Sequence, residues 1–347
     1  MSKLCCVDVD GESFVAHQGD MLLDAALMNG IELPHDCRSG YCGTCRVRVL
    51  SGHTFGGASQ DAGFIRACQA RVISDLRIEV EEAPTTVEVE GRLVDLRKMA
   101  PDVFELGVEP AAPLVFIPGQ YLSLRFRGFP ARHYSPTAPL EPAATRDLLR
   151  FHVRQFRQGQ VSSALGRGIA KGHRVRLSGP FGSAHFRKRN ASRLVLVASG
   201  TGFAPIWAIA DAAMREWPER ELVLIAAARS LHSLYMLPAL CQLAQGPRVT
   251  ITLVSSTQQS FTRAVRFGRP TDHLPVLRPD DLVYAAGAPA MVEAVSAIAH
   301  AAGATCHADP FAPADPGGEG SGLLVRASGW FARRGAAAMR LEAVGSA

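Results

Sequence analysis

Hydrophobic positions in the last third of the chain repeat a strand–turn–helix pattern. Residues 193–214 (RLVLVASGTGFAPIWAIADAAM) predict a buried strand, a Gly-Thr-Gly turn and a helix starting near Pro205, because proline suits the first helical turn. Two more strands are predicted for ELVLIAAARS and RVTITLVSS, and DLVYAAGAPAMVEAVSAIAHAAG predicts a further strand, turn and helix. Such alternation indicates a parallel sheet covered on both faces, which binds ligands at the carboxyl ends of its strands. Both Gly-rich turns fall at such ends, although SGTGFAP lacks the GxGxxG fingerprint.

The middle of the chain has a shorter period. After the acidic, proline-containing stretch 81–91 (EEAPTTVEVEG), roughly six short candidate strands predict a small antiparallel barrel. In RHYS, Arg132 and Tyr134 fall on one face of a strand, where they offer a guanidinium to a phosphate and a ring to a flat heterocycle. An ordinary exposed strand has the same pattern. GQVSSAL predicts a helix start that suits an anion.

Near the N-terminus, HDCRSGYCGTCRVRV carries three cysteines at C-x4-C-x2-C spacing, and a fourth follows in RACQA. Four thiolates bind zinc or an iron–sulfur cluster. Zinc sites usually have two C-x2-C pairs, and this stretch has one, whereas the plant-type 2Fe-2S centre has the observed spacing. Glycines between the cysteines allow backbone N–H groups to turn toward the sulfurs. The predicted metal ligands are Cys37, Cys42, Cys45 and Cys68.

This region resembles the plant-type ferredoxins, whose fold is a β-grasp, a small mixed sheet holding one helix. The stretch GDMLLDAALMNGIELP predicts that helix, with Asp20 as its N-cap and Gly30 just past its C-terminus. The segment between Cys45 and Cys68 is shorter than is usual in that family, so its loop is expected to differ while the ligand set stays the same.

Composition narrows the class of protein. The length of 347 residues predicts two or three domains. Residues 1–85 have 7 Lys/Arg and 12 Asp/Glu, a net charge of −5, so the remainder of this +5 chain carries +10. The sequence has no basic run interleaved with aromatic residues, so binding to nucleic acid is disfavoured. No apolar run is long enough to span a membrane. The N-terminus turns acidic before any signal-peptide core forms, which favours a cytoplasmic location.

The motifs RHYS, GQVSS, GPFG, GTGFAP and AGAPAM occur in the order seen in the ferredoxin–NADP+ reductase superfamily. With the N-terminal ferredoxin module, residues 1–311 resemble the reductase components of bacterial aromatic-ring-hydroxylating oxygenases, such as the naphthalene and benzoate dioxygenase reductases. The resemblance implies a multidomain fold: a β-grasp 2Fe-2S domain (1–85), an antiparallel FAD-binding β-barrel (86–188) and an α/β parallel-sheet NAD(P)-binding domain (189–311). Residues 312–347 lie beyond it, and their linker-like start predicts a flexible tail, with a short amphipathic helix that contacts a partner or membrane surface as the alternative.

The resemblance also implies roles for individual residues. Arg132 pairs with a flavin phosphate, Tyr134 packs on the isoalloxazine ring, and the Ser135 hydroxyl lies near flavin N5. The flavin diphosphate is expected in a turn made by Gly159, Val161 and Ser162. The nicotinamide nucleotide is expected against a first loop of Gly200, Thr201 and Gly202 and a second loop of Gly287, Pro289 and Met291. Arg229 is expected to contact the adenosine side, and Phe311 to be the aromatic residue near the flavin.

Two features depart from the family or leave a choice open. The family often has Cys where this chain has Ala286, a change that is expected to slow hydride transfer without abolishing it. The stretch AAARSLHSLYM has neither an acidic residue for a ribose 2′-OH nor a basic cluster for a 2′-phosphate, so family analogy favours NADH, with NADPH as the alternative. For Phe311, a place in the core is an equal alternative.

The implied activity is transfer of electrons from NADH through FAD to the 2Fe-2S cluster, in the catabolism of aromatic hydrocarbons. The protein orients the cofactors and tunes the reduction potential of the cluster, which lies near roughly −400 mV for clusters of this type. No acid or base is required, and Ser135 and Thr201 are the side chains expected nearest flavin N5 and the nicotinamide. The expected partner is a Rieske-type ferredoxin or the terminal oxygenase. The alternatives are a diiron monooxygenase or deoxysugar dehydrase as acceptor, or a non-enzymatic metal and nucleotide sensor.

Overall fold

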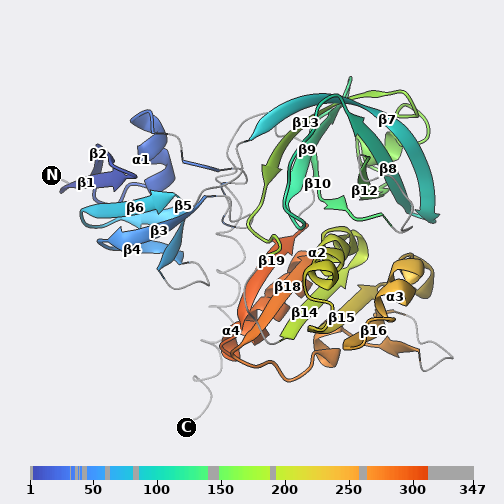
Figure 1. The fold of residues 1–347 in the computed structure, drawn as a ribbon. Helices are drawn as coiled ribbons and strands as arrows, with labels where there is room; N and C mark the ends of the chain where they lie inside the picture. Colours follow the sequence, from blue (N-terminus) through green and yellow to red (C-terminus); the bar gives the residue numbers. More distant parts are fainter. Residues whose placement is uncertain are drawn as a thin grey trace, which may run out of the picture. The chain divides into compact units, whose positions relative to one another are not determined.

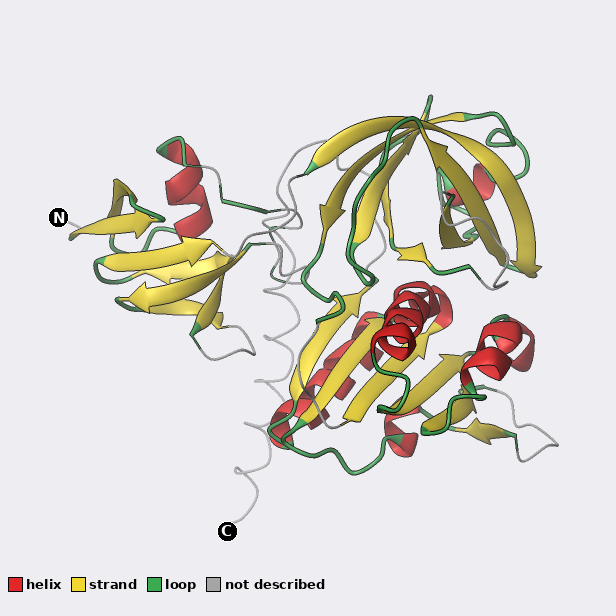
Figure 2. Cartoon of the chain, viewed as in Figure 1, coloured by secondary structure: helices red, strands yellow, loops and turns green. Residues whose placement is uncertain are grey.

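The computed structural model describes residues 3–31, 33–35, 38, 40, 45–58, 63–80, 86–139, 148–187, 193–257 and 264–311. These residues form three separate sheets (Figures 1 and 2). Of the helices in these residues, the one near the N-terminus packs on the first sheet, and the three later ones pack on the third. The predicted tail, 312–347, and the cysteines Cys37 and Cys42 lie outside the described residues. Among the described residues, no helix combines the length and apolar character needed to cross a membrane.

The first sheet is mixed and holds one helix, as the β-grasp prediction requires. Its strand order is β2-β1-β6-β3-β5-β4, with β1 and β6 parallel and the other pairs antiparallel. Leu22, Leu23 and Ala26 of the helix are buried in the core of this sheet. The elements are β1 Leu4–Val9, β2 Glu12–His17, α1 Leu22–Met28, β3 Arg46–Ser51, β4 Thr54–Ala58, β5 Phe64–Val72 and β6 Leu76–Val80.

The two ends of α1 differ in how well the sequence predicted them. At the C-terminus, Gly30 has φ +77° and its N–H donates to the Leu27 carbonyl, while the Ile31 N–H reaches back to Ala26, which is the Schellman motif. The N-terminal prediction was wrong. The helix is capped by Met21 without a side-chain bond, because the Asp20 carboxylate accepts the His17 N–H at 2.8 Å instead.

The second sheet is antiparallel and curls around its own core, as Figure 2 shows. Its order is β10-β9-β13-β7-β8-β12-β11. Alternate side chains such as Leu106, Leu122 and Phe151 fill the interior. The predicted helix start at GQVSSAL is only a single 3-10 turn, η1 Ser162–Ala164. The strands are β7 Val87–Ala100, β8 Val103–Pro110, β9 Tyr121–Phe126, β10 Arg132–Tyr134, β11 Pro136–Thr137, β12 Leu149–Arg154 and β13 Arg174–Phe181.

The third sheet is parallel throughout, in the order β17-β16-β15-β14-β18-β19. The helices are α2 Phe203–Glu216, α3 Leu237–Leu243 and α4 Pro289–Ala301, and the strands are β14 Arg193–Ser199, β15 Glu221–Ala228, β16 Val249–Ser255, β17 Val265–Phe267, β18 Asp281–Gly287 and β19 Thr305–Pro310. Short 3-10 turns lie at η2 Gly200–Gly202, η3 Leu231–Ser233 and η4 Pro270–His273.

Both faces of this sheet are covered, as predicted. Leu196 of β14 packs in one core with Trp207 of α2 and Leu240 of α3, whereas Val197 packs in a second core with Val295 of α4. From β14 the chain moves outward to β15, β16 and β17 and then returns to β18 on the other side of β14. The strand order therefore reverses between β14 and β18, which is where sheets of this kind bind ligands.

Candidate functional site

Two of the four predicted cluster ligands are described, and they lie on neighbouring strands. Cys45 directly precedes β3 and Cys68 lies in β5, where the Ala67 N–H donates to the Cys45 carbonyl at 2.9 Å. Both cysteines are buried. Two buried cysteines on neighbouring strands can supply two of the four thiolates that an iron–sulfur cluster needs.

Gln69 links the strand to the cysteine loop. Its amide Nε2 donates to the Cys68 carbonyl at 2.9 Å and to the Arg38 carbonyl at 3.2 Å. Gly40 has φ +81°, and a Cβ there would lie 2.8 Å from the Gln69 side chain. The loop therefore needs glycine at this position both for its backbone conformation and for its close packing on Gln69. The sequence analysis did not single out Gln69.

The RHYS residues lie together on the barrel. Arg132 and Tyr134 share a face of β10, which pairs with β9. The Arg132 guanidinium donates to the Ala131 carbonyl at 2.7 Å and to Gln160 Oε1 at 3.1 Å. Tyr134 packs partly buried against the barrel core, where burial raises its pKa to about 12 against the opposing effect of the Arg132 charge. The phenol is therefore neutral, and Ser135 beside it is buried.

Thr137 on β11 is a candidate contact that the sequence analysis missed. Its hydroxyl Oγ1 is buried and has no hydrogen-bond partner among the described residues. A buried hydroxyl without a partner costs free energy unless a ligand or water pairs with it. Thr137 lies two residues after Ser135, whose hydroxyl is expected near the flavin. The signal in the sequence is the alternation that places a second hydroxyl residue just after RHYS.

The predicted diphosphate loop is a tight turn. The Ser162 hydroxyl accepts the Phe156 N–H at 3.1 Å, and a Cβ on Gly159 would overlap that hydroxyl. Val161 is 2% exposed and packs into the barrel core, so only its backbone is available to a ligand. The Arg132–Gln160 bond connects this turn to the RHYS strand. The residues expected from Arg132 to Ser162 thus form one neighbourhood.

The two Gly-rich loops touch each other at the switch point. A Cβ on Gly202 would overlap the Ala286 carbonyl and lie 2.6 Å from Gly287 Cα. Gly287 has φ +125°, and a Cβ there would overlap the Ser199 carbonyl and hydroxyl. The Ser199 hydroxyl also accepts the Ala288 N–H at 2.9 Å. Backbone meets backbone here, so both loops require glycine where they touch, whereas Gly200 beside them faces open space; the two touching loops form one cradle.

Other expected residues surround this cradle, with one exception. Thr201 lies in η2, Pro289 begins α4, and the Phe311 N–H donates to the Gly287 carbonyl at 2.7 Å. Met291, however, packs partly buried against the core on the far face of the sheet. Arg229 follows β15 with an exposed side chain.

A pocket opens beside η2 at the carboxyl ends of β14 and β15. Its lining includes Gly200, Phe203, Ala226, Tyr235 and Met236. The sequence analysis predicted ligand binding at these strand ends but did not identify Tyr235.

Asp309 near the end of β19 is another residue that the sequence analysis missed. It lies opposite Ala286 of β18, and its Oδ2 is buried without a hydrogen-bond partner in the described part of the chain. Burial raises the pKa of this carboxyl to about 7. A perturbed carboxyl at a ligand-binding strand end is typical of functional sites. The only signal was an acid in the apolar HADPF motif.

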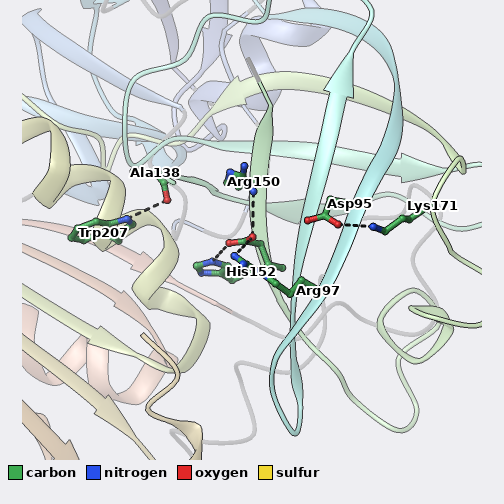
Figure 3. Close-up of polar contacts among 8 residues, drawn as sticks. Asp95, Arg97, Ala138, Arg150, His152, Lys171 and Trp207 are labelled. Atoms are coloured by element: carbon green, nitrogen blue, oxygen red, sulfur yellow. Dashed lines mark hydrogen bonds and ion pairs between the residues drawn. The ribbon is translucent and has the colours of Figure 1, made fainter. Parts of the chain in front are cut away.

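The barrel and the parallel sheet are joined by hydrogen bonds close to these sites. Trp207 of α2 donates its indole N–H to the Ala138 carbonyl at 3.2 Å, next to Thr137 (Figure 3). The helix that follows the Gly-Thr-Gly turn is therefore tied to the strand that follows RHYS.

Comparison with known proteins assigns a family to each of the three sheets. Residues 7–72 match the 2Fe-2S iron-sulfur cluster binding domain, residues 92–186 the oxidoreductase FAD-binding domain and residues 196–297 the oxidoreductase NAD-binding domain. These matches confirm the predicted fold class, the three cofactors and the assignment as an oxidoreductase.

Similar proteins serve oxygenases. The chain is 31% identical to the ferredoxin–NAD(P)+ reductase component of the Pseudomonas putida naphthalene 1,2-dioxygenase system, over 85% of this chain and 94% of that protein. It is 32% identical to the xylene/toluene monooxygenase electron transfer component of Pseudomonas putida, over 72% and 75%. The structure of an Amycolatopsis cytochrome P450 reductase matches with a TM-score of 0.66 and 31% identity, over 89% and 99%. The predicted resemblance and electron-transfer function are thereby confirmed, and the chain belongs to the family of ferredoxin–NAD(P)+ reductase components of oxygenase systems.

Proposed function

We propose that this chain passes electrons from NADH, through FAD and a 2Fe-2S cluster on Cys37, Cys42, Cys45 and Cys68, to a Rieske-type ferredoxin or the terminal oxygenase of an aromatic-ring-hydroxylating system. The observation that carries the proposal is the Trp207–Ala138 hydrogen bond. It connects the helix after the nucleotide turn to the end of β11, the strand that follows the expected flavin residues, and hydride transfer requires those two sites to be neighbours.

When bound, FAD accepts a hydride from NADH and gives up electrons singly, as the cluster requires. Arg132 neutralises a flavin phosphate, and its bond to Gln160 aims the guanidinium at the Gly159–Ser162 turn. Tyr134 offers a neutral aromatic face to the ring system, and Ser135 and Thr137 offer hydroxyls beside it. No side chain in this arrangement needs to gain or lose a proton for hydride transfer.

The Gly200–Gly202 and Gly287 loops meet backbone to backbone at the switch point, and the nucleotide binds on their open side at Gly200, where a Cβ would meet no atom within 4 Å. The first turn of α4, with Pro289 and the backbone of Met291, borders the second loop. Arg229 contacts the adenosine side, and Phe311 closes the cleft near the flavin. NADH is the preferred donor, because the stretch around Arg229 has no basic cluster for a 2′-phosphate.

The domain bounds are part of the proposal: 1–85 for the cluster domain, 86–188 for the flavin domain, 189–311 for the nucleotide domain and 312–347 for a tail. A cytoplasmic location fits the free cysteines, such as Cys5 and Cys306, that the described part of the chain contains. A monooxygenase acceptor is the second candidate, since the xylene/toluene relative serves one.

An anaerobic visible spectrum of the purified protein, taken before and after NADH, tests the proposal. Flavin and iron–sulfur bands that NADH bleaches are expected, with a slower response to NADPH. A zinc-containing colourless protein, or coloured bands that neither nucleotide bleaches, would contradict it. Reconstitution with a Rieske-type ferredoxin and with a diiron monooxygenase then separates the two acceptors.

A further inference from the structure

A buried carboxylate lies on the outer face of the barrel, where the mechanism does not use it. Glu105 of β8 is 1% exposed, while its neighbour Leu106 points the other way into the barrel core. Cross-strand pairing puts Arg97 of β7 on one side of Glu105 and His152 of β12 on the other. Figure 3 shows the Arg97, Arg150 and His152 side chains converging on this one group.

The contacts keep Glu105 ionised. Arg97 Nη2 lies 2.9 Å and Arg150 Nη1 3.3 Å from Oε1, and His152 Nε2 lies 3.4 Å from Oε2. Burial alone raises the pKa of the carboxyl, but the His152 hydrogen bond and the surrounding positive charges outweigh it and lower the pKa. An ionised carboxylate only accepts hydrogen bonds.

That restriction sets the direction of the bond to His152, whose Nε2–H donates to Glu105. The other ring nitrogen, Nδ1, lies 3.2 Å from the Tyr235 hydroxyl and is hydrogen-bonded to it, and the two rings meet edge to face with centroids 5.3 Å apart. Burial, and then the charges of Glu105 and Asp102, raise the pKa of the phenol and keep its proton in place.

Tyr235 belongs to the nucleotide domain, between η3 and α3, and it lines the pocket beside Gly200 and Phe203. The chain of hydrogen bonds thus runs from a wall of that pocket to two strands of the flavin barrel. Buried charges are costly to desolvate, and apolar side chains of similar volume in the same place often stabilise a protein just as much. Fixing a geometry is the best-attested reason to retain them.

We propose that Tyr235 and His152 are positioning residues, which together with Glu105 hold the pocket wall 231–243 against the flavin barrel in its nucleotide-binding geometry. The inference rests on the proposed function in one respect, that this pocket receives part of the nicotinamide nucleotide. Without the Tyr235–His152 bond only a fraction of the molecules have the wall in its binding-competent position. The apparent affinity for the nucleotide is then reduced in proportion to that fraction.

The test compares two full-length holoprotein variants that each lose one buried phenol hydroxyl. Tyr235→Phe removes the bond to His152. Tyr284→Phe is the matched control, because its hydroxyl bonds the His185 carbonyl and the Arg187 N–H rather than β8 or β12. NAD+ binding is measured by calorimetry and the exposure of 231–243 by amide hydrogen exchange.

Tyr235→Phe is expected to weaken NAD+ binding about two- to tenfold, the effect of one neutral hydrogen bond, and to speed exchange across 231–243. Hydride transfer at saturating NADH should stay close to wild type. Tyr284→Phe should change neither NAD+ affinity nor that segment. In a His152→Leu background, Tyr235→Phe should add little, because the bond is already lost.

Wild-type affinity and exchange in Tyr235→Phe would overturn the inference, as would equal effects of Tyr284→Phe. If NADH fails to bleach the wild-type protein, the proposed function fails, but the exchange measurement still decides whether Tyr235 holds the wall. Faster exchange with unchanged NAD+ affinity would show that the contact joins the domains without shaping the pocket, and would also overturn it.

Discussion

The replacement Asp309→Asn tests whether burial keeps a proton on this carboxyl in the folded protein. The Oδ2 atom of Asp309 is buried and has no partner among the described residues, and burial raises the pKa to about 7 from its ordinary 3.8. An amide of the same shape cannot ionise, so the variant removes the titration and little else.

The direction of the effect follows from proton linkage. Because the folded pKa lies above the unfolded one, the folded protein binds the extra proton between these values. Stability from this group is full below pH 3.8 and falls until the pH passes about 7. Between pH 5.5 and 7 the loss spans about 1.5 pH units at about 1.4 kcal/mol each, which is about 2 kcal/mol of unfolding free energy.

The assay is urea unfolding of the holoprotein at pH 5.5 and 8.5, with FAD at the same excess throughout because bound ligand adds to stability. Relative to wild type, Asp309→Asn should gain about 2 kcal/mol on going from the lower to the higher pH. Glu12→Gln, at an exposed carboxyl on β2, is the control and should show no such gain. An Asp309→Asn variant whose pH dependence matches wild type would refute the reasoning, because Asp309 would then be ionised in the fold at both pH values.

Three further predictions concern the sheets and the cluster. Gly202→Ala should abolish measurable NAD+ binding in calorimetry while FAD absorbance persists, because its Cβ overlaps the Ala286 carbonyl; wild-type affinity would contradict the contact between the two loops. Asp281→Asn should cost about 3 kcal/mol in urea unfolding, since buried Arg193 loses a carboxylate partner at 2.6 and 3.0 Å and keeps the longer contact with Glu221 at 3.8 Å; a loss below about 1 kcal/mol would mean that water reaches the pair. Cys68→Ser should remove the iron–sulfur absorbance and retain FAD, whereas Cys6→Ser, at an exposed thiol, should leave both bands intact; an unchanged cluster in Cys68→Ser would exclude it as a ligand.

Patterns that repeat within a short stretch were predictable from sequence. The apolar runs of β14, β15 and β18 are buried on both faces, which is why they lack the alternation of a half-exposed strand. The Gly30 terminus of α1 was predictable because only a residue tolerant of positive φ fits there. The α1 start was not, because Asp20 makes its bond backward to His17 rather than forward into the helix.

Features built from distant residues escaped the sequence analysis. Glu105 and His152 are 47 positions apart, and each looks like the exposed polar residue of an alternating strand. Their burial results from a second domain that covers this face through Tyr235. The short elements β17, β19 and α3 were also missed, since three to seven residues with Pro or polar side chains carry too little periodicity.

The backbone contact between the two glycine loops has a thermodynamic consequence. Since Ser199 holds the Ala288 N–H and Gly202 lies against Ala286, both walls of the cleft are fixed before a nucleotide arrives. A cleft formed in advance loses little chain entropy on binding, so more of the contact energy remains as affinity. Oxidised and reduced nucleotide should then meet the same rigid shape, and discrimination between them must come from the charge and planarity of the nicotinamide ring rather than from closure around it.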